Sequence, residues 1–174
     1  MNENFIKASL YFRPIRTYWS KSYLQKNPKV NEIGFYPLSL IKRIKQNHYS
    51  NFDTNGIPRR SDKNKKLIYG YTTLCSYALA LWEDYLTSND ESKKKIFLNI
   101  SNFLLSNVKV KDDLYMFLDY DKNKSIACAM NQGEAISVLI RAYYLTKKQK
   151  YIKLAMKASK AFNYEFDKNG VVKK

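Results

Sequence analysis

The segment from Ala129 to Thr146 constrains the fold more than any other part of the chain. A short polar turn, Asn131-Gln132-Gly133-Glu134, leads into a helical stretch that is apolar on nearly every side. A surface helix keeps one polar face, so a helix that is apolar all round has to be enclosed by other elements. Few soluble folds need such a helix, and the segment therefore predicts a buried helix surrounded by others.

The chain contains two copies of one helical unit. Tyr85-Leu86-Thr87 closes a first helical pattern that starts at Gly70, and Tyr144-Leu145-Thr146 closes the segment above at an offset of 59 residues. Phe103 and Phe162, near the ends of the partner helices, share this offset. Paired helices with a period near 60 residues are typical of an (α/α) toroid or solenoid. We expect the apolar helices inside and the amphipathic helices outside.

Local signals mark the limits of these helices and the segments between them. The spacing of a capping box occurs where the second helix of each unit is expected to start, in Ser88 with Glu91 and in Thr146 with Gln149. Residues 114–120 are rich in aromatic side chains and predict a short strand. The fold class predicted is mainly α, a partial (α/α) toroid of helical hairpins with short β strands or hairpins between the units.

The first third of the chain lacks this periodicity. Residues 1–66 are basic and irregular, with prolines that oppose continuous helices and a clear turn at Asp53-Thr54-Asn55-Gly56-Ile57-Pro58. We therefore divide the chain into a basic N-terminal region, 1–66, and an incomplete toroid, 67–174. The second copy of the repeat runs out before its strand, which predicts a truncated domain.

The net charge of +16 favours an anionic partner, for which acidic polysaccharide, nucleic acid and anionic lipid are the candidates. Lysines outnumber arginines by 25 to 6 and are spread along the chain, whereas dedicated phosphate recognition tends to use arginine forks. A biased composition and a polyanion-facing surface both remain open as causes. No segment reaches the ~20 apolar residues that cross a bilayer. Without a signal-peptide pattern, the cytoplasm is the expected location.

Other chemistries find little support. His48 is the one histidine, which argues against a histidine metal site and a Ser-His-Asp triad, and the five glycines are isolated. Cys75 and Cys128 are expected to be buried free thiols. A calcium site at Asp119 and Asp121 is a weak alternative. No metal and no cofactor is predicted.

With the repeat in place, a resemblance to a known family can be stated. The run from Ala129 to Ser137 resembles the Ala-Met-Ala-Gln-Gly-Gln-Ala-Ile-Ser signature of the D-glucuronyl C5-epimerases, which turn glucuronate into iduronate within heparan-type chains. Four further segments are similar to parts of that family and occur in the same order: the turn at 53–58, the helix at 76–87, Phe117-Leu118-Asp119-Tyr120 and Gly170-Val171.

The resemblance also has gaps. The signature's Ala-Gln-Gly-Gln is Asn131-Gln132-Gly133-Glu134 here, and the family's Glu-Glu-Tyr-Pro strand and its later Asn-Gly-Phe helix have no counterpart. Those segments hold the family's proposed catalytic tyrosines and glutamate. The resemblance therefore implies an isomerase family but assigns no catalytic residue to this chain, which we expect to be inactive alone.

C5 epimerisation needs an acid and a base on opposite faces of the sugar and polar groups around the carboxylate. By the resemblance, this chain contributes the floor of the cleft. The substrate-binding residues predicted are Asp119, Tyr120, Asp121, Met130, Asn131 and Gln132. The plainer alternatives are that Asn131 and Gln132 cap the helix and that the two acids belong to a turn. Arg141 is expected to pair with a buried acid.

The function predicted is thus that of a glucuronyl C5-epimerase-like protein acting on uronic-acid polysaccharide such as heparosan or heparan sulfate precursors. The alternative is a non-catalytic module that binds acidic glycans on the same scaffold. The expected partner is acidic polysaccharide, with neither nucleic acid nor membrane. Because an open toroid exposes apolar helix faces, self-association into a homo-oligomer is also expected.

Overall fold

The computed structural model describes residues 23–24, 33–34, 36–62, 64–121, 124–126 and 128–165, with the side chains of 23–24, 119–121 and 124–126 left aside. Gly170 and Val171 lie outside these ranges. The described chain is mainly helical, which confirms the predicted class. Its helices are α2 (Ile41–Lys45), α3 (Tyr71–Ser88), α4 (Glu91–Asn107), α5 (Ala129–Thr146) and α6 (Gln149–Ser159), followed by the short 3₁₀ helix η2 (Lys160–Asn163).

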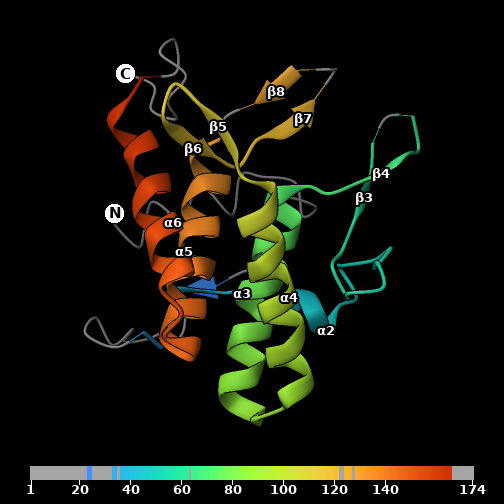
Figure 1. Cartoon of the computed structure of the whole chain (residues 1–174). Helices are drawn as coiled ribbons and strands as arrows, with labels where there is room; N and C mark the ends of the chain where they lie inside the picture. The colour runs from blue at the N-terminus through green and yellow to red at the C-terminus, as the bar shows by residue number, and fades with distance from the viewer. Residues whose placement is uncertain are drawn as a thin grey trace.

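The four long helices form two antiparallel hairpins. Helix α3 packs along α4, α5 packs along α6, and the two hairpins meet chiefly through α3 and α5 (Figure 1). The core between α3 and α5 includes the buried side chains of Leu74, Leu81 and Trp82 from α3 and of Val138 and Leu139 from α5. The two apolar helices are therefore the central pair, as the sequence predicted. That the hairpins belong to a ring stays a prediction.

The repeat is present in the structure, but its offset differs by one residue from the sequence match. Helices α3 and α5 begin at Tyr71 and Ala129, 58 residues apart. Both end on a residue in the left-handed conformation, Asn89 with φ 54° and Lys147 with φ 56°, again 58 apart. Helix α3 includes Ser88 beyond its threonine whereas α5 ends at Thr146, so aligning the two Tyr-Leu-Thr triplets displaces the helices by one residue.

The predicted capping boxes are wrong. Ser88 is the last residue of α3, and the N-cap of α4 is Asp90, whose carboxylate accepts a hydrogen bond from the Ser92 N–H at 2.8 Å. The N-cap of α6 is Lys148, which offers no side-chain acceptor. The left-handed residue after each central helix moves the start of the next helix beyond the position that the sequence spacing indicated.

Four two-stranded antiparallel pairs complete the described fold: β1 (Tyr23–Leu24) with β2 (Leu38–Ser39), β3 (Arg60–Ser61) with β4 (Leu67–Ile68), β5 (Lys109–Lys111) with β6 (Leu114–Met116), and β7 (Asp119–Asp121) with β8 (Lys124–Ile126). The single strand predicted over 114–120 is thus two strands in two different hairpins. The β3–β4 hairpin precedes α3 and the β7–β8 hairpin precedes α5, so each central helix begins just after a hairpin. The β5–β6 hairpin lies at the same end of the helices (Figure 1).

The described part of the N-terminal region packs on the central helices. The Ser39 hydroxyl donates to the Glu83 carboxylate at 2.7 Å, and the Leu40 N–H donates to it at 3.2 Å. The Trp82 indole donates to the Gly34 carbonyl at 2.9 Å, and α2 contacts α3. Residues before 66 therefore share the core of the helices, although their division into a separate region stays a prediction.

The turn at 53–58 has the structure that its sequence predicted. The Asp53 carboxylate accepts hydrogen bonds from the N–H groups of Asn55 and Ile57, each at 2.8 Å, and from the Tyr69 hydroxyl at 2.9 Å. Burial alone would raise the pKa of Asp53, but these hydrogen bonds outweigh it and lower the pKa below 3.8. Gly56 has φ +76°, a conformation that suits glycine.

Candidate functional site

The predicted binding residues come together at one end of the helical hairpins. Met130, Asn131 and Gln132 form the first turn of α5, and strand β7, residues 119–121, belongs to the hairpin directly before it. The start of α3 lies at the same end (Figure 1). The side chains of Asp119, Tyr120 and Asp121 are outside the described part, so only their backbone can be placed here.

The first turns of both central helices are electropositive. The N-caps, Gly70 for α3 and Cys128 for α5, make no side-chain hydrogen bond, and neither first turn contains an acid. The N–H groups of a first helical turn and the helix dipole at that end attract anions. Two helix starts without a side-chain cap at one end of the fold therefore suit a carboxylate. The alternative prediction that Asn131 and Gln132 cap the helix is wrong, because the N-cap is Cys128.

Gln132 connects three elements. Its Oε1 accepts from the Phe117 N–H at 3.1 Å, and its Nε2 donates to the Tyr115 carbonyl at 2.7 Å and to the Ala158 carbonyl at 2.8 Å. The side chain is 1% exposed. These three hydrogen bonds join β6, α5 and the end of α6. Because both amide hydrogens already have partners, the predicted contact of Gln132 with sugar hydroxyls would require one of these bonds to break.

Asn131 is a buried polar residue at the start of α5. Its Oδ1 accepts a hydrogen bond from the hydroxyl of Thr72, which lies in the first turn of α3. Its Nδ2 has no hydrogen-bond partner among the described residues, and the residue is 1% exposed. A buried amide donor without a partner is destabilising, so such groups mark sites where a ligand or water completes the hydrogen bonding. Met130, beside it, is half-buried.

A second polar cluster lies where the N-terminal segment covers the central helices. The Arg141 guanidinium is placed over the Tyr36 ring, 5.5 Å from its centroid, and donates to the Ser137 carbonyl at 3.1 Å. Burial lowers the pKa of Arg141 to about 10. Burial, and then the charge of nearby Glu134, raise the pKa of the Tyr36 hydroxyl. Sequence reasoning noticed Arg141 as a charge in an apolar helix, but not Tyr36; its pairing with a buried acid stays a prediction.

A groove of about 530 Å³ runs along the outer side of α4 and α6 beside β6. Its floor is apolar, and Lys150, Lys153, Lys157 and Lys160 line it together with Tyr115. Sequence reasoning missed this groove, although the lysines recur at intervals of three and four residues and so lie along one side of α6 and the start of η2. Among the described residues, no cluster of histidine, cysteine, aspartate and glutamate side chains suitable for a metal was found. Nor is any described helix long and apolar enough to cross a bilayer.

A family comparison covers the α5 half of this geometry but not the start of α3. Residues 109–174 match the family described as D-glucuronyl C5-epimerase C-terminus. The matched range begins at β5 and includes the β7–β8 hairpin, the α5 start and α6, which confirms the resemblance over this range. No curated protein and no solved structure matches the chain.

Proposed function

We propose that the protein is glucuronyl C5-epimerase-like and acts on a uronic-acid polysaccharide, with the end formed by the starts of α3 and α5 as its saccharide-binding surface. The observation that carries this proposal is the family match over residues 109–174, which contains the α5 start. The reaction class would be the conversion of glucuronate to iduronate by removal and return of the C5 proton.

The chemistry of the site supports an acidic sugar. Two uncapped helix starts attract a carboxylate, and the unpartnered Nδ2 of Asn131 can donate one hydrogen bond. The net charge of +16 draws a polyanion toward the protein. In this proposal Thr72 positions Asn131 by donating to its Oδ1, and Gln132 fixes the backbone around it. The role of the described side chains is to bind the sugar, and no proton-transfer step is assigned to them.

The test measures binding of heparosan by the 174-residue chain, with polyglutamate of matched charge as the comparison. We expect a clear preference for heparosan, because polyglutamate offers carboxylates without sugar hydroxyls. Equal affinity for the two polymers would contradict the proposal and indicate a surface that binds any polyanion. Deuterium uptake at C5 of heparosan in D₂O, followed by NMR, then measures epimerase chemistry directly.

A charge substitution at the site sharpens this test. Asn131→Asp places a carboxylate between the two helix starts, where it repels a uronate, whereas Asn64→Asp makes the same change in an exposed loop. We expect heparosan affinity to fall at least tenfold in the first variant, about 1.4 kcal/mol, and to change little in the second. Circular dichroism verifies that both variants are folded. Equal affinities in the two variants would exclude Asn131 from the site.

A further inference from the structure

We propose that the groove between α4 and α6 is a second binding site for acidic polysaccharide, separate from the helix starts and occupied by the stretch of the same polymer that extends beyond them. This inference rests on the proposed function for the nature of the polymer. Its own basis is the charge, shape and composition of the groove, which the family match and the predicted binding residues do not address.

The groove concentrates positive charge without a counter-charge. Lys150, Lys153, Lys157 and Lys160 line it, and none of them has a carboxylate partner among the described residues. Helix α6 itself contains no acid. Neighbouring like charges at spacings of three and four residues destabilise a helix. An anionic ligand would remove this repulsion.

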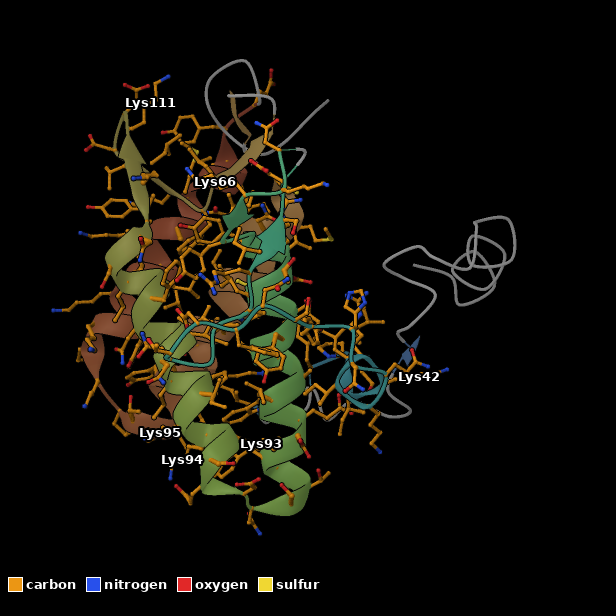
Figure 2. All side chains as sticks on the ribbon, turned by 90° about the vertical axis from the view of Figure 1, so that its right-hand side faces the viewer. Lys42, Lys66, Lys93, Lys94, Lys95 and Lys111 are labelled. Carbon is orange, nitrogen blue, oxygen red and sulfur yellow. The ribbon has the colours of Figure 1, made fainter. Side chains whose placement is uncertain are left out.

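Lysines elsewhere on the chain are arranged differently. Figure 2 shows Lys93, Lys94 and Lys95 near the turn between α3 and α4. Lys94 lies 2.9 Å from the Glu91 carboxylate, and Lys93 lies 3.7 Å from the Asp84 carboxylate. That cluster balances much of its charge locally. The four groove lysines differ from this cluster because they have no carboxylate partner among the described residues.

The dimensions of the groove suit a polymer. From Lys150 to Lys160 the helical rise corresponds to about 15 Å, with one ammonium group on each turn. Leu105 and Val108 from the α4 side and Leu154 from α6 form an apolar floor. A uronan presents carboxylates along its length and apolar C–H faces on its rings, so it matches a lysine rim over an apolar floor.

The one aromatic ring of the groove favours a glycan over a nucleic acid. The ammonium of Lys157 lies over the Tyr115 ring, 4.8 Å from its centroid, and donates to the Tyr115 hydroxyl at 3.2 Å. A base that stacked on this face would have to displace the lysine, and base stacking is a main source of affinity for single strands. The arrangement instead presents a hydroxyl and an ammonium, which are hydrogen-bonding groups suited to sugar hydroxyls and carboxylates.

The groove is connected to the first site through Gln132. Its Nε2 donates to the carbonyl of Tyr115, a groove residue, and to that of Ala158, which lies between Lys157 and Lys160. Gln132 itself belongs to the first turn of α5. One end of the groove is therefore fixed to the helix start at which we place the sugar, so a polymer leaving that site can continue into the groove.

The experiment compares two double variants of the 174-residue chain that remove the same charge. Lys153→Gln/Lys160→Gln removes two groove cations whose side chains have no hydrogen bond or ion pair with any described residue. Lys42→Gln/Lys66→Gln removes two exposed lysines away from α6, both labelled in Figure 2. With heparosan oligosaccharides, we expect the groove variant to bind about fivefold more weakly and with a smaller salt dependence, whereas the control changes less than twofold.

Three results would overturn the inference. If both double variants weaken heparosan binding equally, the groove is not a site, while a preference of the parent chain for heparosan over polyglutamate leaves the proposed function intact. If the parent chain has no such preference, the proposed function fails and the assignment of a glycan to the groove fails with it. If the groove variant loses affinity for DNA or for anionic vesicles but keeps its affinity for heparosan, the groove binds a different partner.

Discussion

Replacing Gln132 with methionine tests whether this residue holds the site together. Methionine has nearly the same length and volume but can form none of the three hydrogen bonds that the amide makes with Tyr115, Phe117 and Ala158. The substitution therefore leaves one N–H and two carbonyl groups without this partner in a site where Gln132 is 1% exposed. Packing changes little, so the loss of hydrogen bonding dominates the result.

The expected loss can be estimated from these three groups. A typical hydrogen bond contributes about 1 kcal/mol net, and a buried group left without a partner costs about 1–3 kcal/mol. At about 1–1.5 kcal/mol for each of the three groups, the lower part of that range, the free energy of unfolding falls by about 3–5 kcal/mol. This is a large share of the 5–15 kcal/mol typical of a domain. With a urea m-value of about 2 kcal/mol/M, the unfolding midpoint falls by about 2 M.

The assay is urea unfolding followed by helical circular dichroism, with Gln149→Met as the matched control because Gln149 is exposed at the start of α6. We expect the control to retain the midpoint of the parent chain within about 0.3 M, since exposed substitutions usually change stability by less than 0.5 kcal/mol. A fall of less than about 0.5 M for Gln132→Met, at an unchanged m-value, would refute the structural role and return Gln132 to the candidates for direct sugar binding.

Three further predictions concern local stability and use the same unfolding assay. Asp90→Ala removes the N-cap of α4 and costs about 1 kcal/mol, whereas Lys148→Asp provides the missing cap of α6 and adds a similar amount; opposite signs contradict the cap assignments. Because hydrogen bonds hold the pKa of Asp53 below its ordinary 3.8, its carboxylate stabilises the fold above that pH and loses this effect as the pH falls through the lowered value. Asp53→Asn should thus be destabilising at pH 7 and progressively less so below pH 3.8, and a difference independent of pH contradicts the shift. Gly56→Ala places a Cβ 3.2 Å from Ile96 at φ +76° and should cost about 1–2 kcal/mol, whereas Gly34→Ala, with no atom within 4 Å, should cost much less.

The helices could be predicted because their signals are local. Apolar residues at helical spacing identified α3 and α5 as central helices and α4 and α6 as their partners. The exact ends of these helices depend on two residues in the left-handed conformation, Asn89 and Lys147. The sequence alone did not reveal this conformation. The matching Tyr-Leu-Thr triplets therefore gave an offset one residue longer than that of the helices.

The sequence proposed neighbouring residues as a candidate site, but it did not show what their side chains contact. The polar turn at Asn131 and Gln132 was recognised, yet nothing local indicates that the Gln132 amide reaches backbone groups of β6 and α6. The same holds for the bonds from Ser39 to Glu83, which join residues 44 positions apart. Contacts of this kind arise from tertiary packing, so the periodicity and spacing of residues in the sequence do not predict them.

The repeat places the proposed binding site where the two hairpins meet. Duplication places two helix starts side by side at one end, and a hydrogen bond between Thr72 and Asn131, one residue from each first turn, joins them. Within the described part of the chain, the Nδ2 of Asn131 then has no partner, and it lies between two electropositive helix ends. Neither unit alone contains this arrangement, because each contributes one helix start and one member of the pair. A uronate bound there would contact both units at once, and its affinity would depend on how the hairpins pack together as well as on the residues that it contacts.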